Sequence, residues 1–585
     1  MISATTSRVS SWAGWFLLAL ALALPFDSIR PLFSVTLAGV AVEFSLLELA
    51  VLPFVFLSLP AVWGEFHARI ERERGRFLFA VFLLWLVCAL LSSAFADDVR
   101  VEAFRFLSRL ALFSLLYWSV RAWLVRTRSS GSTLLLRALI LGSIVSGLIG
   151  FLDWVAPDVT SPALSFFRFG PSHAAGIQRV SATFPYATIA AIHFEMLVPL
   201  GLVVLLRERS LIWRVAGGLV TGLSLFVTVF SWTRTGMVAL ALVLPAALVS
   251  AAVIPKLGRW TRPLFLSIVG LCASVGGLIL ATQDAELRLR TESDLHWAKA
   301  SYRVPEAITG PASGRVETEI LVRNTGERAW EPTGDPITRL QGRWLSSDEE
   351  WLLDDGDLGV LPLDFALPAR VEPGDTARVA VKFDLPAVPG RYVVSWGLVL
   401  DGLYAFRHRG VPEETSPVTV RESSAAGRPP IRSRAIGRTP TSLDQPAHAW
   451  NVPRRDLWYA ALEFFRQRPV LGIGPGTFRF RYGEPLGLER VDQRVHPNNQ
   501  YLQFLAEQGA VGLILFLLLI AGIAAESRFL ADSVRFGAGV AVAIFLVHSL
   551  ADGFLSFVSS YSLFAICLGL LSAGKDRSGS ADRDR

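Results

Sequence analysis

The stretch FLFAVFLLWLVCALLSSAF, residues 77–95, contains no charged side chain. An α-helix needs about 20 mostly apolar residues to cross the hydrocarbon core of a bilayer, so this stretch predicts a membrane-spanning helix. Basic residues Arg72, Arg74 and Arg76 precede it, and Asp97 and Asp98 follow it. Because basic residues accumulate in cytoplasmic loops, the helix is predicted to start at the cytoplasmic face.

The rest of the chain repeats this pattern. Of its 585 residues, 52% are apolar and 18% are charged, and the mean hydropathy is +0.45. This composition excludes a disordered chain, a collagen and a small disulfide scaffold. The three cysteines, Cys88, Cys272 and Cys567, lie inside apolar stretches, so neither a disulfide framework nor a zinc site is predicted. We predict an all-α polytopic membrane protein with about twelve spans, near residues 11–26, 45–63, 77–95, 103–124, 133–154, 186–206, 212–230, 235–254, 263–282, 508–526, 536–554 and 557–573.

Charge in the short loops predicts the orientation. If the N-terminus is cytoplasmic, the loops after spans 2, 4, 6, 8 and 10 should be basic, and they are. Both termini, including a tail at 574–585, are then cytoplasmic, and residues 283–507 are exported. The net charge of +6 is explained by orientation rather than by nucleic-acid binding. The basic residues of these loops are Arg69, Arg72, Arg74, Arg76, Arg121, Arg126, Arg128, Arg207, Arg209, Arg214, Lys256, Arg259, Arg262, Arg528 and Arg535.

The exported segment divides a membrane domain of spans 1–9 (residues 1–283) from spans 10–12 (residues 508–573). Residues 301–421 alternate in the manner of strands, and Val379, Val381 and Phe383 share one face. Turn residues separate the runs, so we predict a small antiparallel β-sandwich. Residues 422–450 are rich in Ser, Arg, Pro and Gly and predict a linker. Residues 451–507 regain helical periodicity and carry most of the polar motifs.

The turn between spans 7 and 8 holds the first motif, Ser-Trp-Thr-Arg-Thr-Gly at residues 231–236. An arginine at this depth is costly in a membrane and often marks a bound anion, which makes Arg234 a candidate functional residue. The alternative is an arginine at a helix end whose side chain reaches the interface.

Two further motifs follow the linker. Arg454 and Arg455 begin an amphipathic helix at 456–467, which either contributes charge to a site or is an ordinary interfacial helix. Residues 469–478 contain Gly474 and Gly476, and repeated glycines let backbone amides approach a phosphate. A tight turn is the alternative, because the spacing does not fit a dinucleotide fingerprint.

The last motif precedes span 10 and includes His496, Asn498, Asn499 and Tyr501. A histidine beside amides at a membrane surface can act as a base or hold a sugar by hydrogen bonds. An exposed histidine without a role is the alternative.

Together these motifs resemble the O-antigen ligase and polymerase family, membrane glycosyltransferases whose fold is related to the GT-C class. The motifs that carry the resemblance are the arginine turn, Arg454 four residues before Trp458, the glycine turn, and residues 496–512. The pattern from Asn324 to Trp396 in the inserted domain is similar to immunoglobulin-like domains appended to some bacterial glycosyltransferases.

The resemblance implies a glycan donor carried on polyprenyl (undecaprenyl) diphosphate, and transfer on the periplasmic side of a bacterial inner membrane. The acceptor is a lipid A core sugar in ligases, another lipid-linked glycan in polymerases, and a protein hydroxyl in related enzymes. Membrane lipids would be the remaining partners, and nucleic acid would not be one. No cofactor or metal is implied, and the exported segment shows no carboxylate pair at metal-ligand spacing.

The resemblance also assigns roles to residues. Arg234 and Arg454 would neutralise the diphosphate as the glycosidic bond breaks, with Arg455 as the substitute for Arg454. Family members commonly carry His-Pro-His-Asn where this chain has Asn498 in place of the second histidine. An amide takes no proton near neutral pH, so three alternatives stay open: His496 is the base, the reaction needs none, or this chain has an altered activity. Gly474, Gly476, Asn498, Asn499 and Tyr501 would contact the substrate.

Two functions from other classes remain as alternatives. A flippase for lipid-linked glycans should line several spans with polar residues, whereas His193 and Glu195 in span 6 are the clearest such pair here. A membrane-anchored carbohydrate-binding protein would use the sandwich, but twelve spans exceed what an anchor needs.

Overall fold

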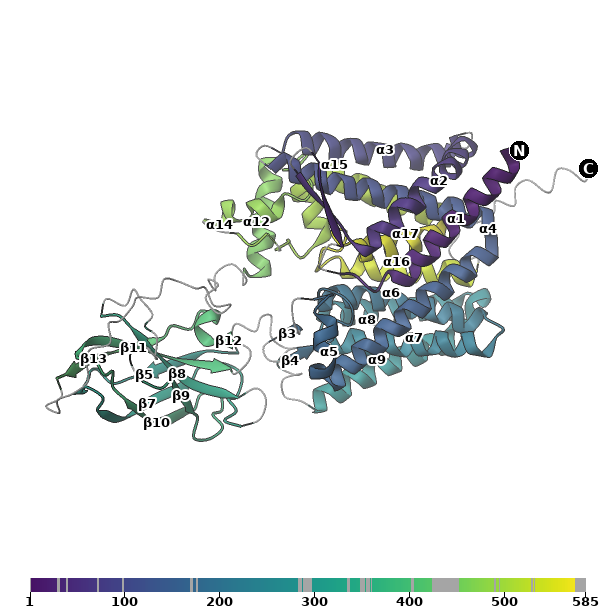
Figure 1. Ribbon diagram of the computed structural model, residues 1–585. Coiled ribbons are helices and arrows are strands. Elements are labelled where there is room, and N and C mark those ends of the chain that lie inside the picture. Colours follow the sequence, from purple (N-terminus) through teal and green to yellow (C-terminus); the bar gives the residue numbers. More distant parts are fainter. Residues whose placement is uncertain are drawn as a thin grey trace, which may run out of the picture. The chain divides into compact units, whose positions relative to one another are not determined.

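The computed structural model describes two compact units, and each is considered by itself (Figure 1). The helical unit comprises Met1–Ser172, Gln178–Leu280 and Arg454–Arg585, and the β-unit comprises His173–Ile177 and Ala281–Pro453. Most of the predicted linker, residues 423–450, and the predicted tail at 574–585 lie outside the described residues. The described residues are 2–28, 32–37, 40–70, 73–96, 99–168, 172–174, 177–281, 287, 297–333, 337–347, 353, 358, 360–400, 404–422, 452–488, 491–493, 495–527, 530 and 532–573.

Nine apolar helical segments of the described chain are long enough to cross a membrane. They correspond to nine of the twelve predicted spans, so the polytopic helical architecture is confirmed. The other three predicted spans are shorter apolar helices, Trp12–Ala23, Ser533–His548 and Val558–Ser572. The main helices are α1 (Ile2–Ala23), α2 (Leu46–Ile70), α3 (Glu73–Ala94), α4 (Arg100–Val155), α6 (Ala187–Arg207), α7 (Leu211–Phe230), α8 (Arg234–Val253), η2 (Pro255–Trp260), α9 (Thr261–Ala281), α15 (Gln500–Ser527), α16 (Ser533–His548) and α17 (Val558–Ser572).

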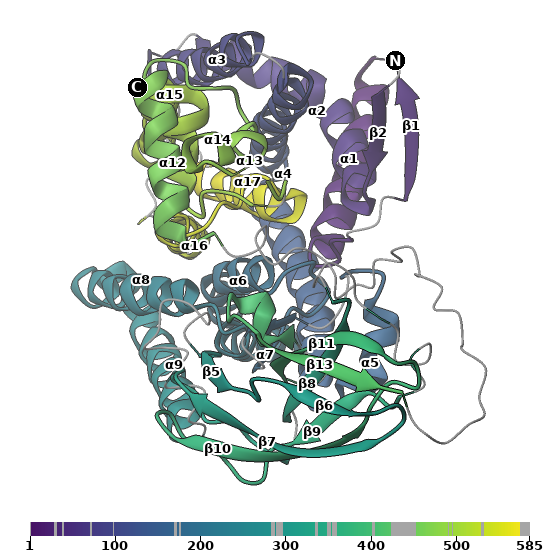
Figure 2. The same ribbon diagram turned by 90° about the vertical axis from the view of Figure 1, so that its left-hand side faces the viewer.

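Smaller elements connect these helices. The polar segment before α15 forms α12 (Arg454–Gln467), α13 (Phe478–Arg481) and α14 (Gly483–Leu486), which gather at one end of the helical unit in both views (Figures 1 and 2). The helix α15 begins at Gln500, eight residues before the predicted span, and is kinked at Gly509. The remaining short elements are α5 (Pro157–Leu164), β1 (Phe33–Leu37), β2 (Val40–Phe44), β3 (Ser172–Ala174) and β4 (Ile177–Arg179).

The helix α4 contains two predicted spans, and the loop expected between them, with Arg121, Arg126 and Arg128, is helical instead. The 56 residues of α4 would extend about 84 Å if the helix were straight. Both halves nevertheless reach one region: Arg109 donates to the Ser556 carbonyl at 3.2 Å, and the hydroxyls of Ser146 and Thr183 lie 2.6 Å apart. Thr183 and the segment that follows Ser556 both contact the residues after α1: Thr183 donates to the Pro25 carbonyl, and Ser559 donates to Asp27. The two ends of α4 therefore lie near each other, so α4 bends back on itself (Figure 1).

Hydroxyl groups give the physical reason for this bend. The side chains of Thr127, Ser130, Ser132 and Thr133 donate to backbone carbonyls three or four residues earlier, at 2.7–3.0 Å. Such hydrogen bonds compete with the helical backbone pattern and bend helices, without ending them. The reversal predicted from charge is therefore present, although no loop forms it.

Contacts sort the interhelical connections into two ends of the helical unit. At one end, which we call the Arg207 end, Arg207 donates to Ser132 at 3.3 Å, Arg259 donates to Ser533, and Arg121 donates to the Ser572 carbonyl. At the opposite His496 end, Asp27 accepts from Ser559 at 2.6 Å, Arg179 donates to the Ser231 carbonyl at 2.7 Å, and Gln500 donates to the Ser549 carbonyl at 2.9 Å. These contacts place the segments after predicted spans 4, 6, 8 and 10 at one end. Which end is cytoplasmic stays a prediction.

The β-unit has two sheets around one hydrophobic core that includes Trp344 and Trp396. One sheet has the order β10-β7-β5 and the other β6-β13-β11-β8-β9, with β12 paired to β11. The inserted β-domain is thus confirmed, but β6 and β13 pair in parallel, so the predicted wholly antiparallel arrangement is wrong. The strands are β5 (Ala300–Arg303), β6 (Ile308–Pro311), β7 (Arg315–Asn324), β8 (Thr338–Leu345), β9 (Leu363–Ala366), β10 (Thr376–Asp384), β11 (Gly390–Leu400), β12 (Tyr404–Ala405) and β13 (Glu414–Arg421), with η4 (Phe406–Arg409) after β12.

Candidate active site

His496 is half-buried in the segment that joins α14 to α15. Its ring centroid is 6.5 Å from that of Phe557. Burial and the positive charges of Arg479 and Arg109 lower the pKa of His496 to about 4. The imidazole is therefore neutral near pH 7 and available to accept a proton.

Arg479 reaches this region from α13. The neighbouring aromatic rings fix that helix, since Phe478 is buried and stacks on Tyr482 with centroids 5.9 Å apart. The guanidinium of Arg479 lies 3.4 Å from a carboxylate oxygen of Glu102. Burial and the nearby charge of Arg109 lower the pKa of Arg479 from its ordinary value, but an arginine remains charged. A partly desolvated cation therefore acts on His496.

Arg109 comes from the first half of α4, where the rest of the helix is mostly apolar. Besides its hydrogen bond to Ser556, its charge acts on His496, on Arg479 and on Asp27. Burial raises the pKa of Asp27 to about 6, so its carboxyl stays largely ionised near pH 7 and partly offsets the charge of Arg109. Asp27 and Glu102 partly offset the two guanidinium groups, whose charge still acts on a neutral imidazole, an arrangement that an anionic ligand would stabilise further.

The glycine turn, residues 469–478, leads directly into α13 and packs against α4. Gly472, Gly474 and Gly476 all have positive φ, at 69°, 111° and 74°. A Cβ at Gly474 would lie 2.6 Å from the Cβ of Ala96, and one at Gly476 2.7 Å from that of Phe106. These glycines are buried where the backbone approaches α3 and α4, so the geometry favours a tight turn over a surface that contacts phosphate.

Glu507 of α15 holds the same turn from the other side. Its backbone carbonyl accepts from the Gly474 N–H at 2.9 Å, and its carboxylate accepts from the Phe478 N–H at 3.3 Å. Gln503 donates to the other carboxylate oxygen at 3.2 Å. This buried network fixes the position from which Arg479 extends.

The residues after His496 start α15. Asn498 has a left-handed φ of 51°, which asparagine tolerates better than most residues. The side chain of Asn499 caps the helix by accepting from the N–H groups of Tyr501 and Leu502, both at 3.0 Å. The Tyr501 hydroxyl donates to the Leu546 carbonyl at 2.8 Å. Asn499 and Tyr501 are thus engaged in holding the fold.

The arginine turn is anchored by a second arginine. Trp232 has a left-handed φ of 53°, and Arg179 donates to the Ser231 carbonyl at 2.7 Å and to the Thr233 hydroxyl at 3.2 Å. Arg234 follows as the half-buried first residue of α8. The turn therefore projects Arg234 from a strained and tightly held backbone.

Both the arginine turn and the His496 segment pack on the end of α16. Gly236 leaves room for the carboxylate of Glu195, which lies 2.7 Å from Nδ1 of His548. The next residue, Ser549, accepts the backbone hydrogen bond of Gln500. The two motifs, which are 260 residues apart in sequence, thus share one support.

Arg454 and Arg455 are arranged differently. Both begin α12 and are exposed, and 89% of the Arg455 side chain is accessible. The opposite face of α12, with Leu457, Ala460 and Phe464, is buried. No described contact joins either arginine to His496, so the cations whose charge acts on His496 are Arg109 and Arg479.

Sequence reasoning missed these two arginines. Arg109 had a usable signal, because it is an ionisable residue inside a predicted span. Arg479 had none, since an Arg among aromatic residues after a turn is common. What the fold assembles is a neutral imidazole beside two guanidinium groups, suited to bind a phosphorylated group and to accept a proton.

Comparison with known proteins adds one match. Residues 393–517 match the family described as O-Antigen ligase. The matched region runs from β11 into α15 and includes Arg454, Arg479 and His496. No curated protein matches the chain.

Proposed function

We propose that this multi-pass membrane protein, which carries an O-antigen ligase domain, transfers a glycan from polyprenyl (undecaprenyl) diphosphate to an acceptor such as lipid A core. In this proposal the protein is a glycosyltransferase of the O-antigen ligase and polymerase type, acting in polysaccharide biosynthesis. The observation that carries the proposal is the neutral His496 beside Arg479 and Arg109, with Arg479 and His496 inside the matched region.

In the proposed reaction, the acceptor hydroxyl oxygen bonds to the anomeric carbon of the glycan while the bond from that carbon to the diphosphate breaks. The electron pair leaves with the diphosphate, and the hydroxyl proton passes to His496. Arg109 and Arg479 stabilise the charge that develops on the leaving group. A bound diphosphate also offsets their positive charge, which raises the pKa of His496 from about 4 and makes it a better base as substrate binds.

The arginines of the two sequence motifs complete the proposal. Arg234, at the start of α8, contributes to diphosphate binding from the other side of the shared support at His548. Arg454, with Arg455 as its substitute, approaches the donor from the exposed start of α12. Asn498 occupies the position of the family's second histidine and contacts the substrate as an amide.

Orientation and the inserted domain follow from the same proposal. The His496 end faces the periplasm of a bacterial inner membrane, and both termini are cytoplasmic. The β-unit, an immunoglobulin-like accessory domain, is on the exported side. In α6, His193 lies 3.0 Å from Ser143 and Glu195 pairs with His548, so each of these buried groups has one neighbouring partner, which favours a transferase over a flippase.

Polymerase activity is the second candidate, because the matched family does not separate it from ligation. Product analysis in cells that lack the protein and then regain it distinguishes the two. A restored glycan cap on lipid A core indicates a ligase, whereas a change confined to glycan chain length indicates a polymerase. Unchanged glycans in both fractions would contradict the proposed function.

A further inference from the structure

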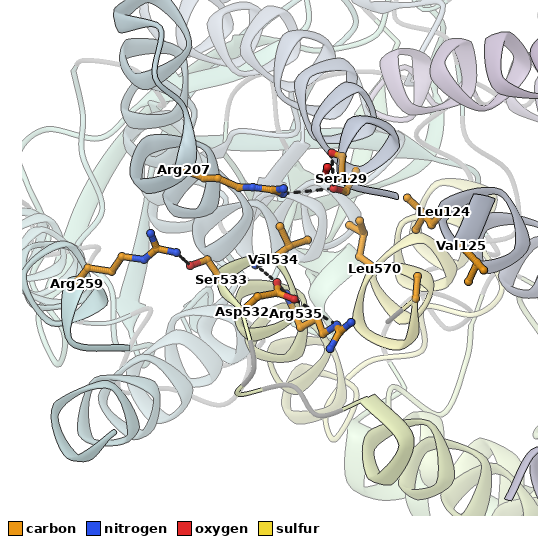
Figure 3. Close-up of a pocket in the computed structure, with 12 residues that line it drawn as sticks. Leu124, Val125, Ser129, Arg207, Arg259, Asp532, Ser533, Val534, Arg535 and Leu570 are labelled. Atoms are coloured by element: carbon orange, nitrogen blue, oxygen red, sulfur yellow. Dashed lines mark hydrogen bonds and ion pairs between the residues drawn. The ribbon is translucent and has the colours of Figure 1, made fainter. Parts of the chain in front are cut away.

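A cavity of about 420 Å³ lies at the Arg207 end, opposite the His496 end of the helical unit, and both polar and apolar side chains line it (Figure 3). Its walls come from the bend of α4, the end of α6, η2, the start of α16 and the end of α17. The size falls within the range of small-ligand sites, about 300–1,000 Å³. Nothing in the proposed transfer reaction uses this cavity.

Three arginines from three different elements line it: Arg207, Arg259 and Arg535 (Figure 3). Arg535 is balanced by Asp532, whose carboxylate lies 3.4 Å away and also caps α16. Within the described part of the chain, Arg207 and Arg259 have hydroxyl partners only, Ser132 and Ser533. Among the described residues, the lining therefore carries an excess of positive charge that no carboxylate balances.

The position of the cavity indicates where its ligand comes from. Arg207 is the last residue of an apolar span, Ser533 is the first residue of an apolar helix, and Leu570 lies in the last turn of another. The cavity thus opens at the depth where apolar helices end, which is the depth of lipid headgroups. Apolar side chains of Leu124, Val534 and Leu570 line it beside the arginines.

We propose that this cavity binds the phosphate group of an anionic phospholipid. Arg207 and Arg259 form charge-assisted hydrogen bonds to the phosphate oxygens, and the apolar wall contacts the glycerol and upper acyl chain. Because the walls include the bend of α4 and the ends of α6, α16 and α17, a bound headgroup holds together the four helices that also support the His496 end.

Native mass spectrometry of the purified full-length protein, titrated with phosphatidylglycerol, tests this. Phosphatidylcholine and inorganic phosphate serve as separate arms. The variant Arg207→Gln/Arg259→Gln should bind phosphatidylglycerol at least about tenfold more weakly than the wild type, since it removes both cations proposed to contact the phosphate. The matched control Arg209→Gln, at an exposed arginine two residues beyond Arg207 and outside the cavity, should bind as the wild type does.

A second variant separates the site from folding. Ser129→Trp keeps all three arginines but fills part of the cavity, and it should weaken phosphatidylglycerol binding while leaving the lipid-free unfolding temperature near that of the wild type. Equal lipid binding by the wild type and both cavity variants would overturn the proposal. Equal binding of phosphatidylcholine, or tighter binding of inorganic phosphate than of the lipid, would overturn the assignment to an anionic phospholipid.

Discussion

His496, Arg479 and Arg109 belong to three separate elements, and their chemistry depends on being together. An isolated histidine would be partly protonated near neutral pH, whereas here burial and two guanidinium groups lower its pKa to about 4. The motif around residue 496 singled out the histidine, but not its partners. Electrostatic coupling between residues up to 387 positions apart, as for Arg109 and His496, follows from packing and leaves no local pattern in the sequence.

Replacing Arg479 by Ala is expected to reduce glycan transfer about 100-fold or more, because the departing diphosphate loses a cation that it needs most in the transition state. Arg479→Lys should recover part of the rate, since it restores charge without the planar fork. The assay is transfer of labelled glycan by purified enzyme. Arg466→Ala is the matched control, at an arginine of the neighbouring α12 whose side chain is 68% exposed. Equal rates in the Arg479 and Arg466 variants would remove Arg479 from the mechanism.

His496 should give the free enzyme an unusual pH dependence. Because its pKa is about 4 rather than 6.5, the neutral base persists in mildly acidic solution, and the acid limb of kcat/KM should lie near pH 4. The free energy of unfolding depends on pH for the same reason. Because the unfolded histidine binds a proton below about pH 6.5 and the folded one only near pH 4, this histidine's contribution to stability decreases as the pH falls from 6.5 towards 4.

Two measurements check this, the pH profile of kcat/KM and the apparent Tm of the wild type and of His496→Gln. The Tm advantage of the wild type should shrink between pH 7 and pH 4.5. A parallel decline of both proteins would show that His496 is not in the buried, cationic environment described here.

At the scale of elements, the glycine turn and the kink of α15 are one structure. Gly509 has a left-handed φ of 66°, and its Cα lies where any Cβ would overlap the Val470 backbone. Hydrogen bonds join the two segments: Ala510 N–H to the Pro469 carbonyl at 2.8 Å, and Ile473 N–H to the Ala506 carbonyl at 2.9 Å. The turn thereby positions α13, and with it Arg479, on α15.

Gly509→Ala is expected to destabilise the protein by about 2 kcal/mol or more and to lower transfer, because it adds both backbone strain and a steric overlap. The apparent Tm and the transfer rate are the measurements. Gly222→Ala in α7 is the control, since a Cβ there meets nothing within 4 Å. That control should be neutral or slightly stabilising, as alanine favours a helix over glycine by about 1 kcal/mol. If Gly509→Ala matched the control, the kink would not require a left-handed residue.

The bend of α4 shows how far element prediction from sequence extends. Hydrophobicity located both spans, and the arginines between them indicated a reversal. A charged, serine-rich stretch was expected to be a loop, but its hydroxyls bond to backbone carbonyls and keep the helix intact through the bend. Composition alone does not separate these outcomes, because the same hydroxyls can also cap and end a helix.

At the scale of the whole molecule, the positions of the apolar helices are the part that sequence predicted best, although three of the twelve predicted spans are shorter helices. Nine spans agree, since apolar length is a strong signal for crossing a bilayer. The β-domain was found from its alternation, but not its parallel β6–β13 pair, because pairing direction depends on chain connections rather than on side-chain pattern. The site was predicted in part, as His496 and the turn at Arg234, with the arginine partners missed.

Sidedness can be tested with single cysteines in intact cells. Arg455→Cys, at an exposed residue of the His496 end, should react with a membrane-impermeant maleimide added from outside. Arg209→Cys, at an exposed residue of the Arg207 end, should react only after the inner membrane is permeabilised. A background variant with Cys88, Cys272 and Cys567 replaced by Ser provides the baseline. The reverse pattern would contradict the orientation drawn from the basic loops.

The proposed glycan transfer is tested most directly by measuring free polyprenyl diphosphate. Purified protein is incubated with a labelled polyprenyl-diphosphate glycan and either lipid A core or a second lipid-linked glycan. Wild-type protein is predicted to release polyprenyl diphosphate in equal amount to the glycosylated acceptor, and Arg479→Ala to release almost none. Absence of release with every acceptor, while the lipid-linked glycan crosses the bilayer of reconstituted vesicles, would contradict transferase function and identify a flippase.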